Sequence, residues 1–521
     1  MKEDKGLNHN LKVIAKTSFF GILTIILAKL FVYIYRVIIA RYYGPEMYGM
    51  FSLAVMVSSL FAVFASFGLF EGLVRFISFY RGRKKQSHIA YLVSWSAKFL
   101  AFSGIIAGMI MFFLSETISV KIFHNSDLII LLKMFSICVP LSIFADSFLA
   151  VLRGYEMINL YSFISTVARN AIKVAFIALF IFIGLKPQAI PLSYMLGTLA
   201  AFIMAFWIYR IKVPKSGIKN LSFAERIRLK DEMLVYSLPL IFSTVIFMIF
   251  GWVDSFAIGY FKSALEVGLY NAAVPIAMAM AVAPDLFMRI FFPMITREYS
   301  RKNINTIREL SKQVSKWIFI VNLPALILLL IFPGAALNIL FGKEYLAAEN
   351  ALRVLALAYF CSAGIGSISL RLVSMTGKSK LILYNNGIAV ILNIILMIML
   401  VPMEFILGFD NSNGLLGASI STLVSLIFMV CLFMIQSYRI TKALPLRRMM
   451  AKIVIASVIP TAALLFFRSM IKINAYSLIL LGIIFLAVYI ITIIAINGLD
   501  RNDLLILNSI KSKISLLSSK R

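Results

Sequence analysis

The chain has 521 residues, of which 61% are hydrophobic and only 14% are charged, and its mean hydropathy is +0.95. A water-soluble protein must cover its surface with polar groups, so this composition excludes a soluble fold and predicts an integral membrane protein. A net charge of +29 is also compatible with nucleic-acid binding, but the placement of the charges along the chain argues against it.

Apolar runs long enough to cross a bilayer recur along the whole chain. A hydrocarbon core about 30 Å thick requires roughly 20 apolar residues per helix, and these runs are too long and continuous for the strands of a membrane barrel. In chain order they lie at about 16–39, 47–79, 88–114, 127–152, 158–184, 189–209, 233–261, 266–296, 314–333, 346–373, 380–403, 413–436, 450–468 and 475–497. The sequence therefore predicts an all-α polytopic membrane protein with about 14 transmembrane helices.

The basic residues outside these runs predict the orientation. If the N-terminus is cytoplasmic, the inner segments carry 34 Lys and Arg residues and the outer ones carry 7. This asymmetry is the positive-inside rule, so we expect a plasma-membrane protein with both termini in the cytoplasm and no nucleic-acid partner. The first apolar run is too long for a signal-peptide core and lacks a cleavage pattern, so we interpret it as a retained span.

Two offsets align one half of the chain with the other. A shift of 219 residues places Gly49-Met50-Phe51 over Gly268-Leu269-Tyr270. A shift of 223 residues aligns Cys138 with Cys361, Leu149 with Leu372, Gly154 with Gly377, Leu160 with Leu383, Tyr161 with Tyr384, Val167 with Val390 and Asn170 with Asn393. The matches predict that spans 1–6 are repeated as spans 7–12, and an even number of spans makes the repeats parallel. Parallel halves around a site at mid-membrane are a transporter architecture.

The predicted organisation has five parts. These are an N-lobe of spans 1–6 over residues 1–211, a cytoplasmic linker with an interfacial helix over 212–232, a C-lobe of spans 7–12 over 233–440, spans 13 and 14 over 441–498, and an amphipathic cytoplasmic tail over 499–521.

Apart from the first four residues and the last residue of each predicted span, the spans contain ten basic residues but only four acidic ones. An ionised side chain at the bilayer centre costs at least about 2.5–3.5 kcal/mol on insertion scales, so such residues usually face a cavity or a partner. Four of the cations lie near span ends and are expected to snorkel to the interface, namely Lys98, Lys133, Arg353 and Arg371. The cationic excess favours an anionic substrate with a phosphate or carboxylate group.

Spacing selects two pairs among the remaining cations. Lys29 and Arg36 are seven residues apart in span 1, and Arg169 and Lys173 are four apart in span 5. Both spacings place the two side chains on one face of a helix. Adjacent positive charges with no acid within a turn predict a cavity that receives an anionic group.

Two further pairs combine an acid with a base. Glu71 and Arg75 are four residues apart in span 2, and Asp285 and Arg289 are four apart in the equivalent span 8. A self-neutralising structural pair and a role in substrate binding or gating both fit this spacing.

Asp146 and Asp254 have no basic residue one turn away. They are candidates for coupling transport to H+ or Na+, and the alternative is an acid that is hydrogen-bonded to a neighbouring helix. The three cysteines, Cys138, Cys361 and Cys431, all lie in spans without a metal-binding spacing, so we expect neither a metal nor another cofactor.

Three segments resemble the polysaccharide transporters of the multidrug/oligosaccharidyl-lipid/polysaccharide flippase superfamily. Residues 35–49 (YRVIIARYYGPEMYG) resemble the first span and loop, residues 68–75 (GLFEGLVR) the end of the second span, and residues 152–156 (LRGYE) the turn after the fourth. The resemblance implies a layout of six, six and two helices and translocation of a lipid-linked oligosaccharide to the outer leaflet.

Related lipid II flippases suggest individual roles. In that family cationic residues in the cavity meet the pyrophosphate, and helices 13 and 14 form a groove for the lipid tail. The resemblance carries the role of a first-span arginine to Arg36, although Val37 stands where the flippases often have an acid. Arg75 and Arg289 fit the family's cationic cavity more loosely.

The predicted function is therefore that of a non-enzymatic flippase working by alternating access on a polyprenyl pyrophosphate-linked glycan. Its anionic group would meet Lys29, Arg36, Arg169 and Lys173. The sequence has no ATP-binding motif, so the candidate energy sources are an ion gradient, the membrane potential or removal of the product. The glycan, lipid carrier and coupling ion stay open, and a monomer is favoured over an oligomer.

Two alternatives stay open. An ion-coupled multidrug extruder of the same superfamily would favour acids in its cavity, against the cationic excess here. A membrane glycosyltransferase or ligase would need a sizeable outer loop, whereas the longest predicted outer connection runs only from about Pro402 to Gly414.

Overall fold

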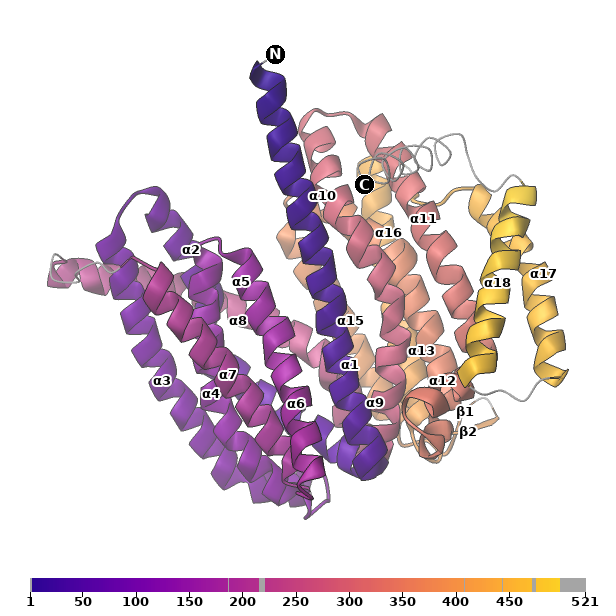
Figure 1. Ribbon diagram of the computed structural model, residues 1–521, viewed down its shortest axis with the longest axis horizontal. Helices are drawn as coiled ribbons and strands as arrows, with labels where there is room; N and C mark the ends of the chain where they lie inside the picture. The colour runs from indigo at the N-terminus through magenta and orange to yellow at the C-terminus, as the bar shows by residue number, and fades with distance from the viewer. Residues whose placement is uncertain are drawn as a thin grey trace. The chain divides into compact units, whose positions relative to one another are not determined.

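The computed structural model describes residues 2–185, 187–214, 221–406, 408–442, 444–470 and 475–496. Its regular secondary structure over these ranges is helical apart from one short hairpin (Figure 1). The predicted amphipathic tail over 499–521 lies outside the described residues, as does part of the predicted linker, 215–220.

The chain forms two compact units. The N-terminal unit comprises Met1–Ala272 and Val390–Ala418, and the C-terminal unit comprises Ala273–Ala389 and Ser419–Arg521. The predicted lobes are defined by sequence repetition rather than by contacts, and their boundaries stay a prediction.

The N-terminal unit contains the first eight helices and part of the ninth. They are α1 (Lys2–Ala65), α2 (Leu69–Gly82), α3 (Gln86–Glu116) with a π-helical extension (Thr117–Ile122), α4 (Leu128–Gly154), α5 (Ile158–Ser162), a π-helical turn (Phe163–Ala168), α6 (Arg169–Phe182), α7 (Ala189–Lys212), α8 (Phe223–Phe261) and α9 (Ala264–Met278), which ends in the C-terminal unit.

The remaining elements follow in chain order. They are a 3₁₀ turn (Ala279–Ala281), α10 (Val282–Ser300), α11 (Ile304–Ile331), α12 (Pro333–Leu340), a 3₁₀ segment (Lys343–Ala348), α13 (Glu349–Cys361), a π-helical turn (Ser362–Gly366), α14 (Ser367–Ser374), α15 (Ser379–Leu400), strands β1 (Phe405–Ile406) and β2 (Phe409–Asp410), α16 (Leu415–Thr441), α17 (Met449–Met470) and α18 (Ala475–Ala495).

A kink divides α1 into two helical stretches. Gly44 has φ 82° and ψ 174°, a conformation that residues with a Cβ rarely adopt, and Pro45 follows it without an N–H to donate. The kink falls between predicted spans 1 and 2. The described residues hold 13 candidate membrane spans, the first of which, Lys29–Ala65, runs through this kink and includes two of the predicted 14. The predicted all-α, multi-pass fold is confirmed.

The predicted second span, 47–79, is interrupted. Helix α1 ends at Ala65 and α2 begins at Leu69, because Phe67 has a positive φ of 48°. The Ser66 hydroxyl donates to the carbonyl oxygen of Val63 and accepts from the Gly68 N–H, which satisfies backbone groups at the break. Hydropathy does not detect this break, because its residues are as apolar or small as those of the helix.

Helix α4 is central to the N-terminal unit and packs on α1, α2, α3 and α7 (Figure 1). Its C-terminal end contributes Phe148, Leu149 and Leu152 to an apolar core that α7 completes with Ala201 and Ala205. This packing sets the positions of the polar side chains of α4 and α7, among them Asp146 and Tyr194.

Two glycines allow the second stretch of α1 to cross the start of α9 closely. A Cβ on Gly49 would overlap the carbonyl oxygen of Ala264, and a Cβ on Gly268 would overlap that of Pro45. Next to this crossing the Tyr48 hydroxyl donates to the carbonyl oxygen of Asn271 at 3.1 Å. Gly49 and Gly268 are the residues aligned by the 219-residue shift, so equivalent positions of the predicted repeats meet here.

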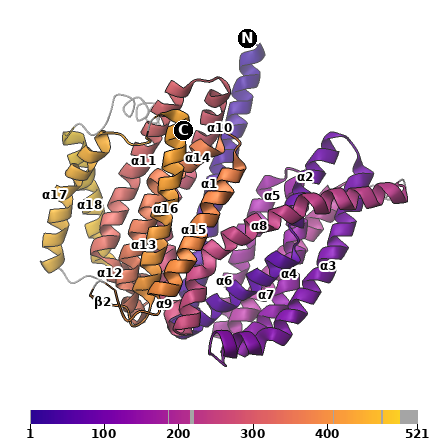
Figure 2. The same cartoon turned by 180° about the vertical axis from the view of Figure 1, so that it is seen from behind.

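In the C-terminal unit, α11 packs on α10, α13 and α17. The predicted spans 13 and 14 are α17 and α18, which lie side by side (Figure 2). The Tyr489 hydroxyl of α18 donates to the carbonyl oxygen of Ile320 on α11 at 3.2 Å, and Phe485 packs with Phe332. The final helix pair is therefore joined to this unit by a defined core.

Candidate functional site

A polar cavity of about 370 Å³ lies within the N-terminal unit. It is lined by hydroxyl groups and by three charged side chains, from α1, α2, α4, α6, α7 and α8. The polar lining residues are Ser58, Ser59, Ser66, Glu71, Ser142, Asp146, Arg169, Tyr194 and Thr244. Hydroxyls and charges in helices of this hydropathy mark a region that is not filled by lipid.

Arg169 is the cation of this cavity. It begins α6 directly after the π-helical turn Phe163–Ala168, and such turns often occur at functional sites. Its Nη2 donates to Oδ1 of Asp146 on α4 at 3.0 Å, with the side chains 17% and 40% exposed. The buried Nε of Arg169 has no hydrogen-bond partner within the described part of the chain. One carboxylate oxygen thus leaves part of the guanidinium fork unused.

Lys173 lies one turn further along α6 and is buried. Its Nζ lies 3.4 Å from the centroid of the Tyr194 ring on α7, a cation–π contact. The two helices approach closely here, since a Cβ on Gly197 would overlap Lys173 Cγ. The predicted shared face of Arg169 and Lys173 is therefore directed toward Tyr194 and α7.

Helix α1, which carries Arg36, packs on α6, and Arg36 is within electrostatic range of Lys173 and Tyr194. Lys29 is half-buried two turns earlier on the same helix. Of the predicted cations, Arg169 contacts Asp146 and Lys173 contacts Tyr194, while Arg36 lies on the neighbouring helix. We call these five residues the cationic cluster.

Glu71 has a different partner from the one its spacing suggests. Arg153, in the last turn of α4, donates to both of its carboxylate oxygens at 2.9 and 2.7 Å. Arg75 instead places its guanidinium over the Tyr236 ring of α8, 3.9 Å from the centroid. The predicted Glu71–Arg75 pair is thus replaced by a pair between helices, because α2 and α4 pack closely where Gly154 meets Ile77.

The other acids lie outside the cationic cluster. Asp254 on α8 accepts a hydrogen bond from the Tyr270 hydroxyl of α9 at 2.7 Å, which matches the alternative of an acid bonded to a neighbouring helix. Asp285 and Arg289 are exposed on α10 in the C-terminal unit. No group of three His, Cys, Asp or Glu residues suited to a metal ion is found in the part of the chain that the structure describes.

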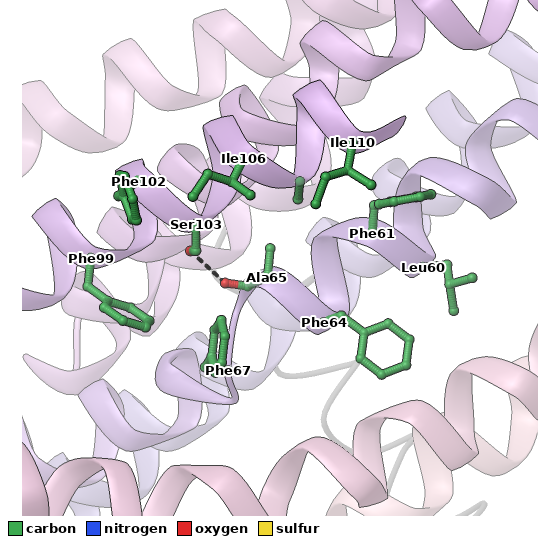
Figure 3. Close-up of a pocket in the computed structure, with 11 residues that line it drawn as sticks. Leu60, Phe61, Phe64, Ala65, Phe67, Phe99, Phe102, Ser103, Ile106 and Ile110 are labelled. Carbon is green, nitrogen blue, oxygen red and sulfur yellow. Dashed lines mark hydrogen bonds between the residues drawn. The ribbon is translucent and has the colours of Figure 1, made fainter. Parts of the chain in front are cut away.

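A second, apolar pocket of about 490 Å³ lies beside α3 in the same unit (Figure 3). Phe99, Phe102, Ile106 and Ile110 of α3 face Leu60, Phe61, Phe64 and Phe67 from the end of α1 and the break after it. The drawn hydrogen bond runs from Ser103 Oγ to the carbonyl oxygen of Ala65, at 2.8 Å. The end of α1 therefore has serines on the polar cavity and large apolar side chains on this pocket.

The signals that sequence reasoning missed are tertiary ones. Tyr194 and Arg153 were not among the predicted site residues, since one resembles an ordinary interfacial tyrosine and the other a cytoplasmic anchor. The residues next to them in the sequence do not indicate which charged side chain each one contacts. An acid within a span that has no basic residue one turn away, such as Asp146, is a signal of a partner on another helix.

Solved transporter structures have the same fold. An inward-closed lipid II flippase, MurJ, matches with a TM-score of 0.68 and 16% identity over 91% of this chain and 97% of its own. An inward-facing multidrug resistance transporter of the MATE family matches with a TM-score of 0.64 and 14% identity over 80% of this chain and 96% of its own.

The chain is also similar in sequence to proteins whose names describe glycan transporters. A protein of Shigella flexneri named "Putative O-antigen transporter" is 24% identical over 392 residues, which cover 74% of this chain and 88% of the relative. A Haloferax volcanii protein named "Probable low-salt glycan biosynthesis flippase Agl15" is 21% identical over 58% of this chain and 60% of the relative. Residues 14–298, more than half of the chain, match the family model described as polysaccharide biosynthesis protein. The chain therefore belongs to the polysaccharide biosynthesis protein family and is a multi-pass membrane transporter of that family.

Proposed function

We propose that this protein is a non-enzymatic flippase that carries a polyprenyl pyrophosphate-linked glycan from the inner to the outer leaflet by alternating access. The observation that carries the proposal is the cationic cluster, in which Arg169 binds Asp146 through one nitrogen and has a buried Nε without a partner among the described residues. A buried guanidinium with unused donors fits an anionic oxygen.

A pyrophosphate matches this cluster in charge and in number of acceptors. Arg36 and Arg169 supply two positive charges against one from Asp146, and a bound anion favours the charged form of the buried Lys173 as a third. Phosphate oxygens accept from the planar fork of arginine in pairs, whereas lysine acts as a point charge. We assign the phosphate groups to Arg169 and Lys173, with Arg36 and Lys29 on the α1 side.

The neighbouring apolar pocket supports an amphiphilic substrate. Over residues 58–66 the end of α1 directs Ser58, Ser59 and Ser66 to the polar cavity, while Leu60 and Phe64 line the apolar pocket. A lipid-linked glycan needs both environments within a few ångströms of each other. A water-soluble sugar phosphate would need only the first.

Asp146 is the acid we propose for coupling. An incoming phosphate competes with it for Arg169, and the released carboxylate becomes free to take up H+ or Na+. Glu71, Asp254 and Asp285 are proposed as gating acids, with Arg289 as a further cation of the C-terminal unit. The proposed direction of transport depends on the charge asymmetry of the sequence, which predicts that both termini lie in the cytoplasm of a plasma-membrane protein.

A multidrug extruder of cationic compounds fits the site less well. Such a substrate requires an available carboxylate, yet both acids of the cavity, Glu71 and Asp146, are bound by arginines. The names of the sequence relatives, an O-antigen transporter and a glycan flippase, also support the glycan substrate.

The test is a flipping assay with purified protein in liposomes. Fluorescent polyprenyl pyrophosphate glycans of several compositions are loaded, and the fraction that becomes accessible in the opposite leaflet is followed for the wild type, Arg169→Gln and Arg210→Gln. Arg210 is the matched control, an exposed arginine of the same unit that lies over Phe206.

We expect the wild type and Arg210→Gln to move at least one glycan at similar rates and Arg169→Gln to be slower by about tenfold or more. Equal rates for all three proteins would refute the assignment of the site. No movement of any glycan by the wild type would refute the function.

A further inference from the structure

A third pocket of the N-terminal unit, of about 500 Å³, lies between α2 and α8. The two helices pack together near the N-terminal end of α8 (Figure 2). The pocket is lined by Arg75, Phe76 and Phe79 of α2 and by Glu232, Val235 and Tyr236 of α8. We call it the α2–α8 pocket. The cationic cluster contributes no residue to it, and the flippase proposal does not use it.

Arg75 has hydrogen-bonding capacity that the protein leaves unused. Its guanidinium lies 3.9 Å from the centroid of the Tyr236 ring and 5.4 Å from that of Phe76, so aromatic rings hold its position. Within the described residues it makes no hydrogen bond and no ion pair. A guanidinium held against a ring keeps its N–H edges available for an anion.

The neighbouring acids do not neutralise Arg75. Glu71, one turn away on α2, has both carboxylate oxygens bound by Arg153. Glu232, which lines the pocket, accepts from Arg228 Nε at 2.8 Å. The positive charge of Arg75 therefore stays available.

A second arginine follows directly after α2. Arg83 caps the C-terminal end of this helix, and its guanidinium lies 4.2 Å from the ring centroid of Phe79, which lines the pocket. Its side chain likewise makes no hydrogen bond and no ion pair among the residues described. Positions 75 and 79 are four apart, so Arg75 and Phe79 share one face of α2.

Beyond the cations the surface becomes apolar. Val235 and Phe242 on α8 are 73% and 71% exposed, and Leu238 lies between them on the same face. Toward the other end, α8 begins at a capping box formed by Ser222 and Glu225 and continues through basic residues. The α2–α8 pocket thus lies where the helix changes from polar to apolar, the depth at which lipid phosphates are found.

We propose that the α2–α8 pocket binds the phosphate of an anionic glycerophospholipid. The phosphate contacts the N–H edges of Arg75, and Arg83 adds a second positive charge over the lining residue Phe79. One acyl chain lies along Val235, Leu238 and Phe242. Charge complementarity favours an anionic headgroup, because a choline group would meet the same two guanidiniums. The proposal goes beyond the flippase function and does not depend on it.

The test measures lipid binding by native mass spectrometry of the full chain in detergent, titrated with phosphatidylglycerol, phosphatidylcholine or polyprenyl pyrophosphate. The variants are Arg75→Gln/Arg83→Gln and the control Lys84→Gln/Lys85→Gln, which removes two charges from the turn after α2 without altering the pocket. We expect phosphatidylglycerol to bind the first variant roughly tenfold more weakly or worse, and the control to stay within about twofold of the wild type.

Tyr236 provides an independent check of the stacking. Tyr236→Phe keeps the ring beneath Arg75 and is expected to bind like the wild type, while Tyr236→Ala is expected to bind several-fold more weakly. Circular dichroism of each variant confirms that it is folded, and Arg75→Lys/Arg83→Lys, which keeps the charge but loses the planar fork, is expected to bind with intermediate affinity.

Two results would overturn the proposal. One is equal affinity of phosphatidylglycerol for the wild type, the arginine variant and the lysine control. The other is an arginine-dependent preference for polyprenyl pyrophosphate over phosphatidylglycerol, which would give the pocket to the transported lipid.

Discussion

Arg169 combines an ion pair with a buried donor that the ion pair leaves unused. It binds Asp146 through one nitrogen at 3.0 Å while its buried Nε has no partner among the described residues. An unmet buried donor costs about 1–3 kcal/mol, so the arrangement is poor as pure architecture. The arrangement is well suited to an exchange of partners, in which a substrate oxygen accepts the hydrogen bond that the Arg169 Nε does not make with any described residue.

Asp146→Asn tests this exchange. The amide oxygen still accepts from Arg169, but the side chain carries no charge and takes up no proton. We expect binding of polyprenyl pyrophosphate to be unchanged or up to a few-fold tighter, because Arg169 loses a competing anion. Transport by the variant should no longer respond to an imposed proton or sodium gradient. A gradient response equal to that of the wild type would move the coupling site to another acid.

Lys173→Met separates function from stability. A buried charge replaced by an apolar side chain of similar volume often leaves stability unchanged or raises it by about 1–4 kcal/mol. We expect the melting temperature in detergent to stay the same or rise, while affinity for polyprenyl pyrophosphate falls about tenfold. A marked fall in melting temperature with unchanged affinity would show that Lys173 is structural.

For single residues, the sequence predicted well which side chains share a helix face, and poorly which side chains contact each other between helices. The four-residue spacing correctly placed Arg169 and Lys173 together, since helix geometry is local. It could not predict that Arg153 binds Glu71 or that Arg75 stacks on Tyr236, because both contacts join residues far apart in the chain. An i,i+4 pair is worth only about 0.2–0.5 kcal/mol, so a better-placed partner readily replaces it.

At the scale of helices, α1 and α9 cross closely because each has a glycine, Gly49 and Gly268, at the point of contact. Gly49 and Gly268 each face a backbone carbonyl of the other helix, so neither helix accepts a Cβ without separating. The two glycines are also the residues that the 219-residue shift aligns.

Gly49→Ala and Gly268→Ala are expected to destabilise the protein by about 1–3 kcal/mol each, as in other overpacked cores. The matched control is Gly251→Ala in α8, where no atom lies within 4 Å of the added Cβ. It should be neutral or stabilising by up to about 1 kcal/mol, because alanine is the better helix former. Melting temperatures measured in one detergent provide the comparison, and equal values for all three variants would contradict the close crossing.

Helix ends were harder to predict than helices. The break between α1 and α2 lies in a stretch whose hydropathy does not change, and it depends on the positive φ of Phe67 and on hydrogen bonds of Ser66. The kink at Gly44 was foreseeable as a gap between spans, because glycine followed by proline is a strong turn signal.

For the molecule as a whole, charge placement is the feature with the widest consequence. The net charge of +29 divides into anchors in the connections and a small cationic set within the spans. The anchors predict orientation, and the cationic set predicts the charge of the substrate. Confirmation of the multi-pass fold came from 13 candidate spans in the described residues and from MurJ-like and MATE-like structures, none of which determines orientation.

Orientation is tested with single cysteines in a background in which the three natural cysteines are replaced by serine. Lys85→Cys lies in a basic connection and should react with a membrane-impermeant maleimide only when the cytoplasmic face is accessible. Asp410→Cys, exposed on the β1–β2 hairpin, should react from outside intact cells. The opposite labelling pattern would invert the topology and the direction of transport.

The central claim is that the cationic cluster recognises a lipid-linked pyrophosphate. The most direct measurement compares the dissociation constants of polyprenyl pyrophosphate and of the corresponding polyprenol, which lacks phosphate, for the wild type and Arg169→Gln. Our account predicts that the wild type binds the pyrophosphate at least about tenfold more tightly than the alcohol, and that this preference largely disappears in the variant. An equal preference in both proteins would contradict it.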